Sequence, residues 1–174
     1  MPREPSITGT SEAVALTTPR KIQKKRGEMG RLEAIWLKTS HGGAMASASE
    51  VSSQKDKGLL GDANFGRSHR QVTFIEKEIF DAMDHRFSGL IRPEMRRANF
   101  MVKGVELRET VGRILSIGDL KVKISGETKP CKIMDEACEG LMEALNTKWR
   151  GGVFGCVLND ASVKVGDDVD WLLE

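Results

Sequence analysis

The stretch VGRILSIGDLKVKIS, residues 111–125, shows most clearly what kind of fold this chain adopts. In its second half, apolar residues alternate with polar ones: Leu120, Val122 and Ile124 with Lys121, Lys123 and Ser125. A period of two predicts a β-strand with one face in the core and the other in water. Gly118 and Asp119 mark a turn just before this strand.

Several other short segments are compatible with β-structure. They are RLEAIWLK (31–38), NFMVKGVEL (99–107), GGVFGCVL (151–158) and ASVKVGDDVDWL (161–172). Only two helices are expected. One follows a capping box formed by Thr73 and Glu76, and a shorter one is capped by Asp135. Residues 39–70 show little periodicity and predict a long functional loop. This pattern favours a mainly β fold, a small barrel or sandwich with a few short helices.

Length and charge suggest one domain with a basic tail. The chain has 174 residues and a net charge of +2, which suits a single globular domain. Residues 1–30 carry a net charge of +3, so we expect a disordered basic tail there and one folded domain at 31–174. The run RKIQKKR (20–26) could touch nucleic acid or an acidic membrane, but a solvated extension is the simpler interpretation, with no specific nucleic-acid partner.

The sequence also limits the compartment and the chemistry. It has neither an apolar run of membrane-spanning length nor a signal-peptide core. Three cysteines at unrelated spacings do not form a disulfide framework, so we expect a cytoplasmic protein. P-loop, GxGxxG, HExxH, CxxC and GxSxG motifs are absent, and His41, His69 and His85 lack metal-ligand spacing. Dinucleotide enzymes, zinc hydrolases and serine hydrolases are therefore disfavoured.

Four blocks in order carry a family resemblance. They are KGLLGDANFGRSHRQVTFIE (57–76), RRANFMVKGVELRETVGRILSIGD (96–119), SGETKPCKIMDEACEGLMEAL (125–145) and WRGGVFGCVLNDASVKVGDDV (149–169). Together they resemble the MOSC domain, named for the C-terminal part of molybdenum cofactor sulfurases, from about Arg31 to Trp171. The resemblance implies a β-barrel-like fold and a cysteine that ligates molybdenum or carries sulfur. Larger relatives include the mitochondrial amidoxime-reducing component, which reduces N-hydroxylated compounds.

The cysteine in question is Cys131, in the segment ETKPCKIMDE (127–136). The residues alone leave open whether it is a reactive thiol or a small core residue, because free cysteine is commonly buried. The resemblance favours the reactive thiol, as a metal ligand or a sulfur carrier. Thiolate suits a soft metal and is stabilised by nearby positive charge such as Lys129, while Pro130 stiffens the turn. Cys156 and Cys138 are expected in the core, with Cys138 as an alternative resolving thiol.

A phosphate-bearing cofactor would also need an anion site. Arginine binds phosphate through two parallel hydrogen bonds. The resemblance implies that Arg97 and Asn99 meet the cofactor, whereas Arg92 and Arg96 are expected to be solvated. Four further residues are included in the predicted cofactor site: Asp62, Arg70, Thr128 and Lys129. Asp62 could accept hydrogen bonds from the cofactor or stabilise a turn, and Arg70 could reach phosphate or pair with Asp62.

The function expected from the resemblance is binding of the molybdenum cofactor (molybdopterin) through Cys131, with redox or sulfur-transfer activity. Two alternatives remain. One is a persulfide sulfur carrier without metal, and the other is a non-catalytic module that binds a small anion or a partner. The expected partner is a cysteine desulfurase that depends on pyridoxal phosphate, or an electron-donor protein. No convincing Schiff-base lysine is present, so pyridoxal phosphate itself is not assigned to this chain.

Overall fold

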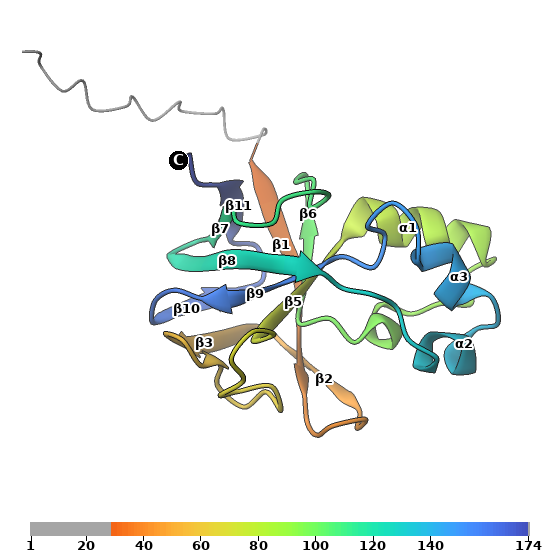
Figure 1. Ribbon diagram of the computed structural model, residues 1–174, viewed down its shortest axis with the longest axis horizontal. Helices are drawn as coiled ribbons and strands as arrows, with labels where there is room; N and C mark the ends of the chain where they lie inside the picture. Colours follow the sequence, from red (N-terminus) through yellow and green to blue (C-terminus); the bar gives the residue numbers. More distant parts are fainter. Residues whose placement is uncertain (1–28, 174) are drawn as a thin grey trace, which may run out of the picture.

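Seven strands form a closed barrel in the computed structural model, which describes residues 29–173 (Figure 1). In barrel order they are β11 (Asp168–Trp171), β7 (Ile114–Ile117), β8 (Leu120–Glu127), β9 (Val153–Val157), β5 (Val72–Glu76), β6 (Phe100–Lys103) and β1 (Gly30–Lys38). Antiparallel pairing of β1 with β11 closes the ring. Among these pairs only β5 and β6 run parallel. The predicted mainly β, barrel-like fold is confirmed.

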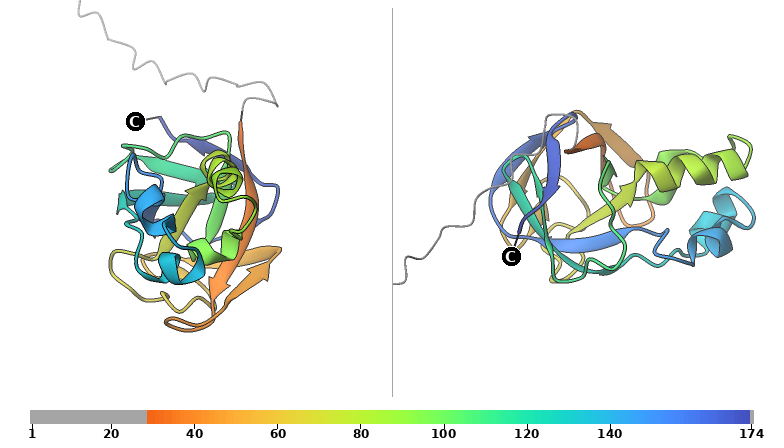
Figure 2. Two further views of the ribbon diagram at one scale, coloured as in Figure 1. Left: turned by 90° about the vertical axis from the view of Figure 1, so that its right-hand side faces the viewer. Right: turned by 90° about the horizontal axis from the view of Figure 1, so that it is seen from above.

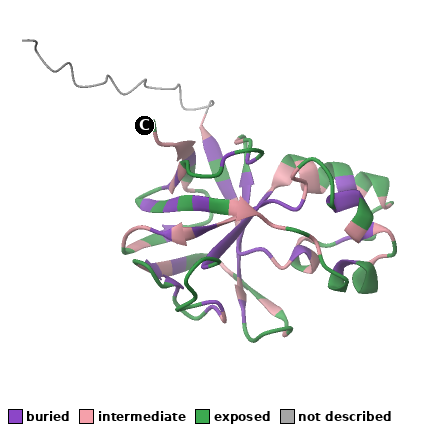
Figure 3. Ribbon diagram, viewed as in Figure 1, coloured by how far each residue is buried: buried purple, intermediate pink, exposed green. Residues whose placement is uncertain are grey.

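Side chains on the inner face of the barrel make one large core. Strand β8 buries Leu120, Val122 and Ile124 and exposes the residues between them, as the alternation predicts. Phe74 and Phe100 are fully buried, and their ring centroids lie 5.5 Å apart. The alternation of buried and exposed positions along β8 is visible in Figure 3.

The expectation of one long loop at residues 39–70 is partly wrong, because this segment contains three short strands. Strand β2 (Met45–Ala48) extends the barrel sheet beyond β1. Strands β3 (Glu50–Gln54) and β4 (Gly58–Leu59) form a second sheet with β10 (Ala161–Lys164). These strands have two to five residues and are rich in Ser, Ala and Gly. They are ordered by pairing with distant strands, so local periodicity does not reveal them.

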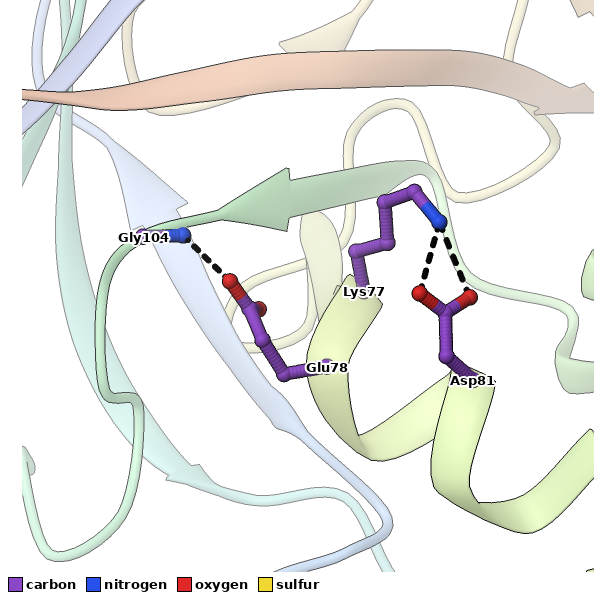
Figure 4. Close-up of polar contacts among 4 residues, drawn as sticks. All are labelled: Lys77, Glu78, Asp81 and Gly104. Carbon is purple, nitrogen blue, oxygen red and sulfur yellow. Dashed lines mark hydrogen bonds and ion pairs between the residues drawn. The ribbon is translucent and has the colours of Figure 1, made fainter. Parts of the chain in front are cut away.

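The helices lie together to one side of the barrel, as Figure 2 shows. They are α1 (Lys77–Arg86), the short 3-10 helix η1 (Pro93–Arg96), α2 (Ile133–Ala137) and α3 (Leu141–Leu145). A smaller apolar cluster joins them, including Met83, Met134 and Leu141, and Cys138 packs against it. The first turn of α1 is tied to the end of β6, because Gly104 N donates to Glu78 Oε1 at 2.8 Å (Figure 4). None of the described helices is long and apolar enough to cross a membrane.

Both predicted helix caps are corrected by the structure. Thr73 lies within β5, where its hydroxyl donates to Asn99 Oδ1, and α1 begins after Glu76 without a side-chain cap. Asp135 lies inside α2 and accepts a hydrogen bond from Met142 N, in the first turn of α3. Gly140, with a φ of 80°, separates the two helices that the sequence predicts as one.

The predicted tail at residues 1–30 lies outside the described residues except for Met29 and Gly30. Gly30 is the first residue of β1 and pairs with Val169. A Cβ on Gly30 would come within 2.7 Å of the Lys103 carbonyl oxygen, which favours glycine at this closure point.

Candidate anion-binding and thiol site

A cleft of about 220 Å³ opens where the β1–β2 turn, the loop before β5 and the segment after β8 meet. Six of its lining residues are cationic: Lys38, Arg67, Arg70, Arg96, Arg97 and Lys129. Cys131 also lines the cleft. Within the described part of the chain, no Asp or Glu lines it. The cleft is therefore strongly cationic, and a thiol stands among the residues that line it.

Lys38, the last residue of β1, is only 8% exposed and is held by a buried polar network. Its Nζ donates to Asn99 Oδ1 at 3.1 Å, and its backbone N–H donates to Asp62 Oδ2 at 2.7 Å. Asn99 Nδ2 donates to the same Asp62 oxygen at 2.7 Å. These hydrogen bonds give partners to the Lys38 ammonium, the Asn99 amide and the Asp62 carboxylate, which would be costly to bury without them.

Burial affects the protonation of Lys38. Desolvation lowers its pKa to about 8, although Asp62 acts in the opposite direction. The positive charges of Arg70 and Arg97 lower the pKa further. Lys38 is therefore mostly protonated at neutral pH, and it loses its positive charge as the pH rises through about 8. A bound anion would favour the protonated form.

The two neighbouring arginines differ in position. Arg96 is buried, with its Nη2 donating to Gly151 O at 3.0 Å, so the expectation of a solvated Arg96 is wrong. Its Nη1 lies 3.6 Å from the Sδ of Met134 in α2. Burial lowers the pKa of Arg96 to about 10, and negative charge on Cys131 acts against that shift. Arg96 therefore stays protonated at neutral pH within reach of the thiol.

Arg97 adopts a left-handed backbone conformation with a φ of 53° and closes η1. Its Nη1 donates to Gly43 O at 2.5 Å, which links it to the β1–β2 turn. The guanidinium lines the cleft and retains further N–H groups for a ligand. Arg97 thus lines the cleft, and the cofactor contact that the resemblance implies for it stays a prediction.

Cys131 is exposed and follows Pro130 in the segment between β8 and α2. Negative charge on its sulfur would raise the pKa values of Arg70 and Arg96, so both guanidinium groups lie within electrostatic reach. The nearby Thr128 Oγ1 is buried, and within the described residues it has no hydrogen-bond partner. Lys129 pairs with Glu127 at the edge of the cleft.

The predicted site residues thus divide into two groups. Five of them line the cleft: Cys131, Arg97, Arg70, Thr128 and Lys129. Asn99 and Asp62 lie behind it, at 0% and 5% exposure, and do not reach its surface. Arg70 does not pair with Asp62; its guanidinium lies 5.7 Å from the Phe154 ring centroid.

Sequence reasoning missed Lys38 and Arg67. Lys38 is the final residue of a short apolar segment, and Arg67 is one of several polar residues in a loop, so neither gave a signal of its own. The expectation that Cys156 is in the core is wrong. It is half-buried on the outer side of β9, and its Sγ contacts the His69 carbonyl oxygen at 3.3 Å.

The donor atoms limit what metal chemistry the cleft could support. Within residues 29–173, no group of three or more His, Cys, Asp or Glu side chains is placed to hold a metal ion. Cys131 offers a thiolate donor in the cleft, and Met134 lines it with a thioether sulfur that lies 3.6 Å from Arg96 Nη1. A metal bound there would have to bring most of its ligands with it, as part of an anionic organic cofactor. The cationic walls, the single thiol and the unpaired Thr128 hydroxyl fit such a group.

These features define a small β-barrel protein with an exposed thiol in a cationic cleft. Residues 40–170 match the family model of the MOSC domain, so the chain belongs to the MOSC domain family. No curated protein sequence matches the chain.

Solved structures share the fold at low sequence identity. The YuaD protein from Bacillus subtilis is 17% identical with a TM-score of 0.70, covering 81% of this chain and 94% of its own. YiiM from Escherichia coli is 14% identical with a TM-score of 0.63, covering 83% of this chain and 70% of its own. YiiM from Geobacillus stearothermophilus is also 14% identical, with a TM-score of 0.66 and coverages of 83% and 75%. These likenesses concern the fold alone.

Proposed function

We propose that this protein binds the molybdenum cofactor in the cationic cleft, with Cys131 as its thiolate ligand. The observation that carries the proposal is the exposed Cys131 thiol in a cleft lined by six cationic side chains. A phosphate monoester carries roughly −1.5 to −2 charges at neutral pH, and the cleft offers cations to match it. Membership of the MOSC family supports the same assignment.

The protein's own residues would bind and orient the cofactor. Lys38 and Arg97 would hold the phosphate, because both are fixed by hydrogen bonds to the protein and both line the cleft. Arg70 and Arg96 lie within electrostatic reach of the Cys131 sulfur and would attract an anionic group bound beside it. When bound, the cofactor would supply two-electron redox chemistry, and an electron-donor protein would be the partner.

A second candidate is sulfur carriage, favoured by the exposure of Cys131. The Cys131 thiolate would attack the outer sulfur of a persulfide on a partner such as a pyridoxal-phosphate-dependent cysteine desulfurase. A new S–S bond would form on Cys131, the donor S–S bond would break, and the donor would leave as a thiolate.

All three cysteines are free thiols, which supports a reducing compartment such as the cytoplasm.

One experiment separates the candidates. The full chain is made in cells rich in molybdenum cofactor, purified without reductant, and analysed for molybdenum by elemental analysis and for persulfide by mass spectrometry. Molybdenum at about one atom per chain, lost in Cys131→Ser, supports cofactor binding. A Cys131 persulfide without metal supports sulfur carriage. The absence of both would reject these functions and leave a non-catalytic module that binds a small anion or a partner. Cys138→Ser is the matched control and should behave as the unmodified chain.

A further inference from the structure

Two of the cleft's cations, Arg67 and Arg70, differ from the others in what they contact. Both are exposed on the loop before β5. The Arg67 Nη2 lies 3.5 Å from His41 Nδ1, and the Arg70 guanidinium lies 5.7 Å from the Phe154 ring centroid. Neither contact uses up the forked N–H donors of an arginine, which suit a phosphate or a carboxylate.

Their positive charges are not compensated by the protein. Among residues 29–173, no carboxylate lies within ion-pair distance of either guanidinium. Partial burial lowers the pKa of Arg70, and the positive charge of Arg67 lowers it further, so the two side chains repel each other. An anion held between them would remove this repulsion.

Arg67 and Arg70 separate two concave surfaces. They line the cleft that contains Cys131, and together with Ser68 and His69 they line an open hollow of about 330 Å³. A ligand bound by both arginines can therefore extend from the outer hollow toward the thiol.

A charge balance suggests what binds there. In the proposed function, one phosphate monoester with roughly −1.5 to −2 charges is matched by Lys38 and Arg97. Of the other cleft cations, Lys129 pairs with Glu127 and buried Arg96 donates to Gly151 O. Arg67 and Arg70 then remain as the two exposed cations without a carboxylate partner among the described residues. Their combined charge matches a second phosphate, whereas a carboxylate would leave one arginine unmatched.

We propose that Arg67 and Arg70 form a second anion subsite, which binds the phosphate of a small organic phosphate substrate and holds it beside Cys131. This inference rests on the proposed function, because it assigns a substrate class to the same site. It also makes these two arginines specificity residues for the substrate, distinct from those that hold the cofactor.

The test is to count inorganic phosphate bound to the full chain, freed of cofactor, by equilibrium dialysis at low ionic strength. Two phosphates per chain are expected. The variant Arg67→Ala/Arg70→Ala should retain one site of unchanged affinity, and its second site should weaken by at least about tenfold. Arg97→Ala should lose the other site and keep the outer one. Arg67→Lys/Arg70→Lys, which keeps the charge, should recover part of the outer affinity.

A matched control removes two exposed arginines elsewhere. Arg86 lies 5.8 Å from the Phe87 ring centroid, much as Arg70 lies over Phe154, and Arg108 is exposed beside Glu109. Arg86→Ala/Arg108→Ala should retain both phosphate sites. Equal weakening in this control would show a general effect of net charge and overturn the subsite. A single phosphate site in the unaltered chain would overturn it as well.

The two proposals fail in different ways. Protein that carries molybdenum but binds no additional phosphate would overturn the subsite and leave the proposed function standing. Protein that takes up no molybdenum but binds two phosphates would overturn the proposed function, while Arg67 and Arg70 would still form an anion site. If both proposals are correct, the variant Arg67→Ala/Arg70→Ala should retain its molybdenum and lose only the additional phosphate.

Discussion

Lys38 Nζ donates a hydrogen bond to Asn99 Oδ1 at 3.1 Å, and this contact fixes the position of a cleft cation through a fully buried amide. Asn99 Oδ1 also accepts from Thr73 N and Thr73 Oγ1, and Asn99 Nδ2 donates to Trp36 O and to Asp62 Oδ2. One side chain therefore connects β1, β5 and the loop after β4. The role of Asn99 in this arrangement is to position Lys38.

The Asn99 network predicts a large loss of stability in Asn99→Ala. Truncation leaves several buried donors and acceptors unpaired, and each costs roughly 1–3 kcal/mol. We expect the free energy of unfolding, measured with urea, to fall by at least about 3 kcal/mol. Asn146→Ala is the control, because Asn146 is exposed and its loss should change stability by less than about 0.5 kcal/mol. A similar small effect for Asn99→Ala would show that the network does not stabilise the fold.

The lowered pKa of Lys38 predicts that anion affinity depends on pH. In the free cleft Lys38 is protonated below about pH 8 and loses its charge as the pH rises through that value. Anion binding favours the protonated form, so affinity should be highest below that pH and fall above it. Sulfate is the suitable probe because its own charge stays constant over this range, and calorimetry gives the affinity. In Lys38→Met the affinity should be lower at neutral pH and nearly independent of pH, and a retained pH dependence would assign it to another group.

Thiol reactivity should follow exposure and charge. Cys131 is exposed near Arg70 and Arg96, whereas Cys138 and Cys156 are half-buried. Limited alkylation of the folded chain with iodoacetamide should therefore label Cys131 first, as read by peptide mass spectrometry. Bound sulfate should slow the labelling if it shares the cleft. Equal labelling of all three cysteines in folded protein would contradict this prediction.

Arg97 should contribute to binding more than to folding. Each hydrogen bond to a charged group is worth roughly 1.5–3 kcal/mol, so Arg97→Ala should weaken phosphate or cofactor affinity by at least about tenfold. Arg97→Lys should recover only part of this loss, because an ammonium cannot reproduce the fork. The cofactor-free variant also loses the bond to Gly43 O and should lose less than about 1.5 kcal/mol of stability. Normal affinity in a strongly destabilised Arg97→Ala would make Arg97 a structural residue.

Much of the fold could be predicted because its signals are local. The alternation in residues 120–125 appears unchanged in β8, and glycine turns separate the strands as expected. The capping box at Thr73 failed because that hydroxyl bonds to Asn99, which lies far along the chain. The strands between residues 45 and 59 were missed because distant pairing partners order them.

The candidate site was predicted in part, for a similar reason. Cys131 and Arg97 belong to short segments whose chemistry can be recognised one residue at a time. Lys38 gave no such signal, because an alternating strand predicts only which face a residue occupies and not what covers that face. Asn99 was expected at the cofactor, but its neighbours on three other segments enclose it completely.

By itself, the sequence determined that the chain is rich in short strands, that it resembles the MOSC family, and that one cysteine follows a proline on a turn. Periodicity and short motifs carry this information because each depends on neighbours along the chain. Only the tertiary structure decided that β1 closes on β11 and that Lys38, Arg67 and Cys131 line one cleft. The physical reason is that burial, charge repulsion and hydrogen-bond partners depend on atoms brought close by the closed barrel, and these atoms lie far apart in the sequence.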